Sequence, residues 1–207
     1  MYVLITVPHG FCIPTEVERM CDRRAEESAK ILADLLSKKA ISHKIIHSHV
    51  PRALVDMNRD KPTIINDTIV NDTIINNNKT NLSRAVKAWD KYNNRIAATI
   101  MKYKAQPILF IDVHSFPKGS FGQAQIAILD ILKKDRPELK TLVKTVRSEL
   151  GLNVQLLKGG KNYIQDQYQA DAYPLLIEFC EDREYLSSKA IKDFFTILIG
   201  ASPYDPA

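Results

Sequence analysis

The chain has 207 residues, of which 45% are hydrophobic and 26% are charged. This composition is typical of a globular protein and excludes a disordered or fibrous one, and the length predicts a single domain over residues 1–207. The net charge of +5 suggests nucleic-acid binding, but the basic residues are scattered among acids, as in KKDRPELKTLVKTVRSEL, which is typical of a solvated helix face. We therefore do not expect a nucleic-acid partner.

The N-terminus, MYVLITVPHG, has no basic leader before its short apolar run, so it predicts a first strand and not a signal peptide. No apolar run reaches the length of a membrane span. We expect a cytoplasmic protein without a membrane partner. The cysteines, Cys12, Cys21 and Cys180, lack the spacing of a zinc ribbon and are too few for a disulfide scaffold, so we expect buried thiols.

The first half of the chain contains several regular patterns followed by a polar stretch. We expect a strand ending at Val7, a helix in 14–39, strands in 42–50 and 53–58, and a loop or loosely held hairpin in the Asn-rich stretch near 62–81. In the expected helix, Thr15 and Glu18 fit a capping box, and apolar residues recur at helical spacing. The helix would therefore include Asp22 and Glu26.

Strands and helices alternate through the second half. We expect a helix over about 82–104, a strand in 107–113, a strand in 123–129, a helix over about 137–150, a strand near 153–157, a turn at KGGKN, a strand in 173–179 and a helix from about Ser187. The strands PILFIDV and YPLLIEF are apolar almost throughout. Together these features predict an α/β fold with a mixed, largely parallel sheet flanked by helices.

Three chemically active side chains follow or end predicted strands. His9 follows the first strand, His114 lies at the end of LFIDVHS, and Glu178 lies near the end of YPLLIEF. Ligands of parallel sheets bind beyond the carboxyl ends of the strands, so the three side chains are expected to meet at one edge. The alternative is that each histidine has a structural role only and is held by hydrogen bonds.

Two histidines, one carboxylate and a water form a catalytic zinc site. The carboxylate could come from Asp22 or Glu26, which would share a helix face, and Asp22 lies nearer the apolar stripe. Glu178 is the candidate base, with a pKa that burial would raise. Asp112 could support His114, although this depends on the real geometry.

Six pieces in order, VPHG, CDRRAE, RALVDMNR, IDVHSFP, LLKGGKNYI and LLIEF, make the sequence resemble the N-formylglutamate amidohydrolase family, which is similar in fold to the zinc carboxypeptidases. The resemblance implies Zn²⁺ held by His9, a carboxylate of DRRAE and His114, with Glu178 as base. It also implies that Asn58 and Arg59 match a pair that receives the substrate's carboxylate in the carboxypeptidase relatives, a role that suits a guanidinium.

Ser115, the neighbour of His114, is a further candidate for substrate binding without a defined role. The sequence departs from the family at WDKYNN, where Asn93 and Asn94 replace a usual aromatic-histidine pair, and in the Asn-rich stretch. Both departures concern the substrate more than the metal.

The leading hypothesis is a zinc-dependent amidohydrolase that cleaves the C–N amide bond of a small N-acyl, N-formyl-like amino acid or a peptide-like substrate. Zinc is preferred among metals because nitrogen and carboxylate ligands with an open position suit it. The alternative is a non-catalytic metal- or ligand-binding module that keeps the fold.

Overall fold

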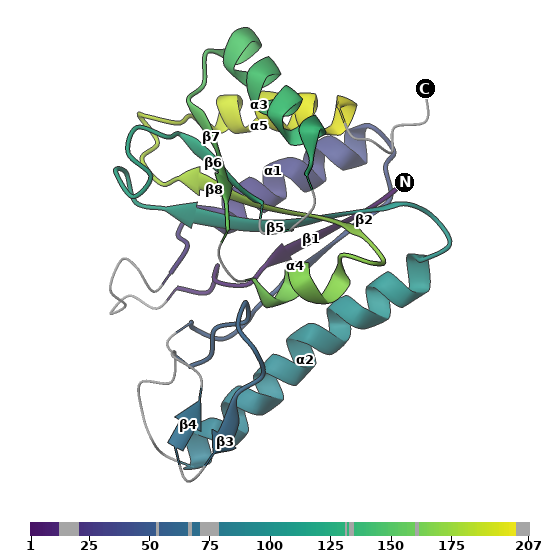
Figure 1. Cartoon of the computed structure of the whole chain (residues 1–207), viewed down its shortest axis with the longest axis vertical. Coiled ribbons are helices and arrows are strands. Elements are labelled where there is room, and N and C mark those ends of the chain that lie inside the picture. The colour runs from purple at the N-terminus through teal and green to yellow at the C-terminus, as the bar shows by residue number, and fades with distance from the viewer. Residues whose placement is uncertain are drawn as a thin grey trace.

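The fold is built on a six-stranded sheet in the order β2-β1-β5-β8-β6-β7 (Figure 1). The structure, a computed structural model, describes residues 1–12, 21–52, 54–65, 68–70, 79–130, 132, 135–159 and 162–201. The strands of this sheet are β1 (Tyr2–Val7), β2 (His43–His47), β5 (Ile108–Phe116), β6 (Ile126–Asp130), β7 (Val154–Lys158) and β8 (Tyr173–Cys180). The helices are α1 (Ala25–Lys38), α2 (Lys79–Tyr103), α3 (Pro137–Leu150), α4 (Tyr163–Tyr168) and α5 (Ser188–Gly200).

Most neighbouring strands in the sheet run parallel. The pairs β1–β2, β1–β5, β5–β8 and β6–β7 are parallel, and only β6–β8 is antiparallel among the pairs of this sheet that the structure describes. All nine residues of β5 are buried, as expected for a central strand covered on both faces. The predicted mixed, largely parallel sheet flanked by helices is confirmed.

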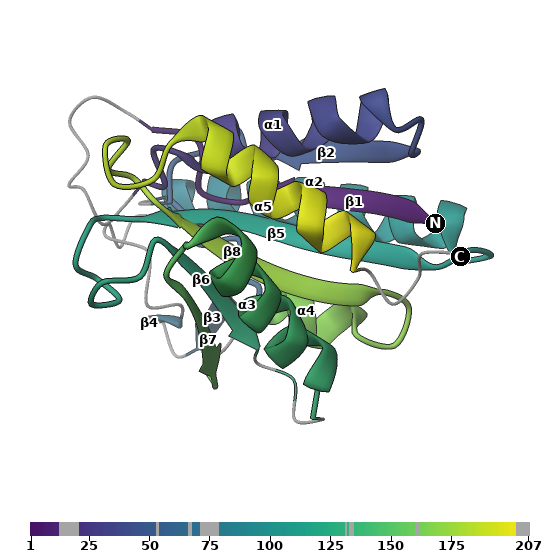
Figure 2. The ribbon, with the colours of Figure 1, turned by 90° about the horizontal axis from the view of Figure 1, so that it is seen from above.

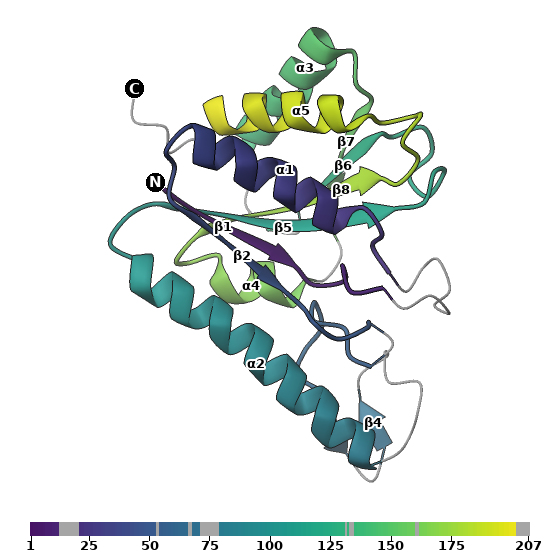
Figure 3. The ribbon, with the colours of Figure 1, turned by 180° about the vertical axis from the view of Figure 1, so that it is seen from behind.

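Helices cover both faces of the sheet, so the molecule has two apolar cores. On one face, Ile5, Ile111 and Ile177 belong to the larger core, which includes buried residues of α1, α3 and α5. On the other face, Leu4 and Phe110 pack with residues of α2 and α4 in the smaller core. The views from above and from behind show α1 and α5 on one side of the sheet, and the view from behind shows α2 and α4 on the other (Figures 2 and 3).

The predicted helix over 14–39 begins later than expected. Helix α1 starts at Ala25, whose N–H bonds to the carbonyl of Asp22, so Asp22 lies in the turn before the helix. The N–H of Asp22 also bonds to the carbonyl of His9. This bond holds the segment against the end of β1 and prevents it from continuing the helix. The proposed capping box of Thr15 and Glu18 falls outside the described residues.

The expectation of three buried thiols is wrong for two cysteines. Cys12 and Cys21 form a disulfide, which bridges nine positions of sequence between β1 and α1. Cys12 is exposed and Cys21 is buried. Cys180 is a buried free thiol, as expected. The two half-cystines meet because the segment after β1 and the turn before α1 lie side by side, which the cysteine spacing alone does not reveal.

Two further segments differ from the predictions. Residues 54–58 form turns and not a strand, because Leu54 N–H and Val55 N–H bond to the Pro51 carbonyl and the Asp56 carboxylate accepts the Asn58 N–H. Helix α4 was not predicted; it begins directly after the KGGKN segment. The turn predicted there falls partly outside the described residues.

The Asn-rich stretch contains a hairpin of β3 (Thr63–Ile65) and β4 (Thr68–Val70), which agrees with the hairpin alternative. Within the described part of the chain, none of the helices has both the length and the apolar content required to cross a membrane.

Candidate active site

One cavity of about 450 Å³ brings together the side chains that were expected to meet at an edge of the sheet. Because β1, β5 and β8 run parallel, their carboxyl ends lie on the same side of the sheet. His9 follows β1, His114 lies near the end of β5, and Glu178 is its direct partner on β8. All three line the cavity together with Asp22. The predicted convergence is therefore confirmed.

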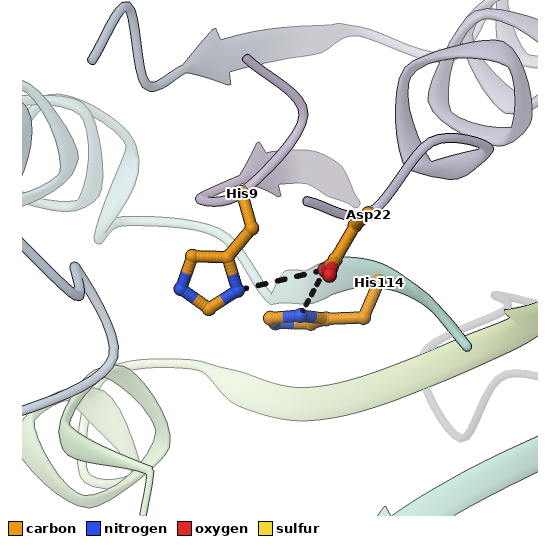
Figure 4. A group of neighbouring side chains, drawn as sticks. All are labelled: His9, Asp22 and His114. Atoms are coloured by element: carbon orange, nitrogen blue, oxygen red, sulfur yellow. Dashed lines mark hydrogen bonds and ion pairs between the residues drawn. The ribbon is translucent and has the colours of Figure 1, made fainter. Parts of the chain in front are cut away.

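His9, Asp22 and His114 form a buried group of potential metal ligands (Figure 4). Asp22 Oδ2 lies 2.7 Å from His114 Nδ1 and 3.5 Å from His9 Nδ1. The three potential ligand atoms lie within 4.8 Å of one another. Both imidazoles thus direct their Nδ1 atoms toward one carboxylate, as the figure shows. Two nitrogens and one oxygen in this arrangement could hold a divalent metal ion.

Each imidazole is fixed through its other nitrogen by a second buried aspartate. His9 Nε2 lies 2.8 Å from Asp56 Oδ1, and His114 Nε2 lies 3.0 Å from Asp112 Oδ2. An Nε2–H that donates to a carboxylate leaves the Nδ1 lone pair available for a cation. The buried Nδ1 of His9 has no hydrogen-bond partner among the described residues. The unpartnered His9 Nδ1 beside the Asp22 carboxylate fits a site that receives a metal ion.

Both oxygens of the Asp112 carboxylate accept hydrogen bonds. Its Oδ1 accepts the Thr6 hydroxyl at 2.6 Å, and its Oδ2 accepts the Asn58 and Asn162 amides at 3.0 and 3.1 Å. Asn58 Nδ2 also lies 2.8 Å from His114 Nε2; with a proton on Nε2 both atoms are donors, so this is a close contact and not a hydrogen bond. These donors come from β1, the turn at 54–58 and the segment before α4. They fix the carboxylate and, through it, the orientation of His114.

Asp56 has an equivalent position behind His9. Arg52 donates from Nε and Nη2 to Asp56 Oδ2 at 3.1 and 3.0 Å, and the Asn58 N–H donates to Asp56 Oδ1 at 2.9 Å. Asp56 is fully buried, whereas Arg52 is partly exposed and lines the cavity. The Arg52 charge compensates a carboxylate that would otherwise be costly to bury.

The electrostatics of the group favour a cation at its centre. Burial raises the pKa values of Asp22, Asp56 and Asp112, but their bonds to His9 and His114 outweigh this effect and hold each carboxyl below its usual pKa. Burial lowers the pKa values of the two histidines, and the same carboxylates raise them above the ordinary value. Three buried carboxylates therefore stabilise positive charge at this point, either as protons or as a metal ion.

Glu178 has the opposite behaviour. Burial, opposed by the neighbouring His114, raises its pKa from 4.5 to about 7. Its side chain lines the cavity and is partly exposed. A carboxyl with a pKa near neutrality can accept and return a proton at physiological pH, which is the property required of a general acid-base group.

The structure separates the two carboxylates that the sequence left open as ligands. Asp22 is 5% exposed and contacts both histidines. Glu26 is exposed on α1, and its Oε1 pairs with Lys30 Nζ at 2.8 Å. Glu26 is not part of the buried group.

The predicted substrate-binding residues all line the cavity, with different contacts. Arg59 is partly exposed there, and Asn58 uses its amide to bond Asp112. The Ser115 hydroxyl donates to Glu181 at 2.8 Å and accepts the Arg24 N–H at 3.1 Å, so it connects β5 to the turn before α1. Its role in substrate binding stays a prediction.

Several residues that shape the site were not predicted from the sequence. Asp56, Arg52, Thr6 and Asn162 had no predicted role, although Asp56 lies in the quoted segment RALVDMNR. The available signal was an aspartate within an otherwise apolar segment, and its partner His9 lies 47 positions away. Asp112, considered as a possible support, does contact His114.

The sequence model of the family described as "FGase: N-formylglutamate amidohydrolase" matches residues 1–171. The chain belongs to the N-formylglutamate amidohydrolase family. The predicted family is thereby confirmed, and membership supports an enzymatic, hydrolytic function. Five of the six sequence pieces lie within the matched residues, whereas LLIEF lies beyond them. Among curated proteins, none matches this sequence significantly.

Solved structures share the fold at low sequence identity. A gene product of Agrobacterium tumefaciens aligns with a TM-score of 0.67 and 14% identity, over 96% of this chain and 89% of that one. The catalytic domain of CwlV, an N-acetylmuramoyl-L-alanine amidase from Bacillus (Paenibacillus) polymyxa var. colistinus, aligns with a TM-score of 0.50 and 12% identity, over 97% and 96% of the two chains. This N-formylglutamate amidohydrolase family member thus has an amidase-like fold.

Proposed function

We propose that the protein is a zinc-dependent amidohydrolase that cleaves the C–N amide bond of a small N-acyl amino acid or a peptide-like substrate. The observation that carries this proposal is the presence of Glu178 beside the buried group of His9, Asp22 and His114 in one cavity. Family membership supports the hydrolytic reaction. The amidase named among the structural relatives also supports a C–N bond as the target.

Zinc held by His9 Nδ1, Asp22 and His114 Nδ1 would supply Lewis acidity toward the scissile carbonyl and would acidify a water. Asp56 and Asp112 face the Nε2 atoms of the two imidazoles, which favours the tautomer that presents Nδ1 to a metal. Their negative charge also increases the basicity of the ligands. The side chains that would hold zinc are therefore already oriented before a substrate binds.

Glu178 would move the proton. In its ionised form it takes the proton that the attacking water loses, and in its acid form it returns this proton to the amine nitrogen as the C–N bond breaks. Its pKa of about 7 allows both forms near neutral pH. Its position directly across the strand pair from His114 puts the proton acceptor beside the metal ligands.

Arg59 would bind the carboxylate of the amino-acid half of the substrate. A guanidinium offers paired N–H donors that match a carboxylate. Arg59 lines the same cavity as Glu178, and the turn that carries it is fixed by the bond of Asn58 to Asp112. Asn58 therefore both lines the cavity and holds Asp112 by a hydrogen bond.

The test is turnover of N-formyl and N-acetyl amino acids by zinc-loaded protein, compared with its Glu178→Gln variant. We expect hydrolysis by the unaltered protein, and no detectable hydrolysis but equal zinc binding by the variant. Equal zinc binding with no turnover of any substrate by the unaltered protein would favour the alternative of a non-catalytic binding module. Full activity of Glu178→Gln would contradict the assigned role of Glu178.

A cytoplasmic location stays a prediction. The disulfide of Cys12 and Cys21 is a feature of proteins in oxidising compartments more than of cytosolic ones. Detecting free thiols in protein isolated under alkylating conditions would test whether the bridge forms in the cell.

A further inference from the structure

The part of the cavity lining that lies beside Glu178 on β8 and β6 is apolar. Leu176 lies two residues before Glu178 on β8, so both side chains are on the same face of the sheet. Leu129 on β6 is the direct cross-strand partner of Leu176. Leu176 is buried, Leu129 is partly exposed, and both line the cavity.

The arginines among the described lining residues, Arg52 and Arg59, do not lie on β6 or β8. Both belong to the segment that the Asn58–Asp112 hydrogen bond holds against β5. Leu129 lies on β6, two strands away from β5, which is about 10 Å in an ordinary sheet. Arg52 already donates twice to the buried Asp56, so its charge has a partner.

Two described basic residues near the end of β6 are also compensated. Lys158 Nζ lies 2.5 Å from Asp130 Oδ2, and the buried Arg136 pairs with Asp130 Oδ1 at 3.4 Å. Neither of these two cations lines the cavity. An acidic group placed over Leu129 and Leu176 would lose its hydration without gaining a cation from the described lining, which is unfavourable.

The reaction determines which half of the substrate meets these leucines. Glu178 protonates the leaving amine, so the amino-acid half must lie over Glu178 while Arg59 holds its carboxylate. Leu176 begins about 7 Å from Glu178 along the strand, which is within reach of an extended amino-acid side chain.

We propose that the cavity selects amino acids with an apolar side chain, such as leucine or methionine, which Leu129 and Leu176 accept. This inference rests on the proposed function and specifies its substrate class. It departs from the glutamate in the name of the family, because the side chain of glutamate ends in a second carboxylate. Contact with an apolar surface favours the leucine side chain, and desolvation opposes the glutamate side chain.

The test is the ratio of kcat/KM for N-formyl-L-leucine to that for N-formyl-L-glutamate, measured with the zinc-loaded full chain. We expect a ratio of roughly 100, within the roughly 10–200-fold range that a hydrophobic pocket achieves for a single methylene. Hydrolysis of both compounds with glutamate equal or preferred would overturn this inference and leave the proposed function intact. Failure to hydrolyse any N-acyl amino acid would overturn the proposed function and this inference with it.

Two variants test whether Leu129 contributes to this substrate selection. Leu129→Lys, which adds a cation to the cavity floor, should lower the ratio at least tenfold by raising turnover of the glutamate substrate. Leu157→Lys is the matched control, because Leu157 is the neighbour of Leu129 on β7 but does not line the cavity. An equal effect of both variants, or an unchanged ratio in a folded Leu129→Lys variant, would contradict selection by these leucines.

Discussion

Replacing Glu178 with glutamine should change the pH dependence of stability as well as abolish catalysis. The raised pKa means that the folded chain binds the Glu178 proton more tightly than the unfolded chain does. The stability associated with this proton is complete below the unfolded pKa of 4.5 and is lost as pH rises through the folded value of about 7. Glutamine cannot lose a proton, so the variant avoids this loss.

The size of the effect follows from the shift. A rise from 4.5 to about 7 corresponds to roughly 3 kcal/mol at about 1.4 kcal/mol per pKa unit. This is an upper limit, because the side chain is partly exposed to the cavity and water reduces the penalty of its charge. We therefore expect the metal-free Glu178→Gln variant to be more stable than the unaltered chain by roughly 1–3 kcal/mol above neutral pH, and nearly equal to it below pH 4.5.

The assay is urea unfolding of chelator-treated protein at a series of pH values from acid to weakly alkaline. The quantity compared is the difference in free energy of unfolding between the two proteins at each pH. Glu149→Gln, an exposed position on α3, controls for the removal of one carboxylate. A difference that does not grow with pH would refute the conclusion that Glu178 is held in an environment unfavourable to its charge.

Four further predictions concern the rest of the site. Asp112→Asn should weaken zinc binding by roughly 10–100-fold in a calorimetric titration, whereas the exposed Asp171→Asn should not, and equal affinities would exclude a supporting role. Arg59→Lys should raise KM about tenfold or more with little change in kcat, since a charge-assisted hydrogen bond contributes roughly 1.5–3 kcal/mol; an unchanged KM would remove Arg59 from substrate binding. The pH profile of kcat/KM should fall on the acid side with a midpoint at or below about 7, because Glu178 must be ionised and bound zinc lowers its pKa; a rate that increases toward acid would contradict this. Cys12→Ser should lower the free energy of unfolding by roughly 2–3 kcal/mol, and a reductant should destabilise the unaltered chain equally but not the variant.

The sheet and the meeting point of the site could be predicted from sequence because both depend on local patterns. The apolar strands that precede His114 and contain Glu178 are recognisable from composition, and parallel strands place their ends at a common edge. Parallel strands were enough to predict that these residues meet His9 at one edge, whereas the order of β1, β5 and β8 as neighbours in the sheet is known only from the structure. The roles of the three side chains remain proposals.

The remaining features depend on contacts between distant parts of the chain. Asp22 was preferred over Glu26 because of a helix face, but Asp22 precedes the helix and reaches the histidines through the turn held by the His9 carbonyl. Asp56 contacts His9 across 47 positions, and Thr6 contacts Asp112 across 106. The disulfide joins cysteines only nine positions apart, but their pairing depends on how the turn before α1 lies against the end of β1. No periodicity encodes such contacts, so spacing arguments could not identify them.

Zinc titration of the chelator-treated protein, with two matched variants, tests the central claim most directly. The account predicts one zinc ion per chain in the unaltered protein and in Glu26→Gln, whose carboxylate is exposed and pairs with Lys30. It predicts that Asp22→Asn loses more affinity than the roughly 10–100-fold expected for a supporting carboxylate. Absence of zinc binding in the unaltered protein, or loss of binding in Glu26→Gln and not in Asp22→Asn, would contradict the account.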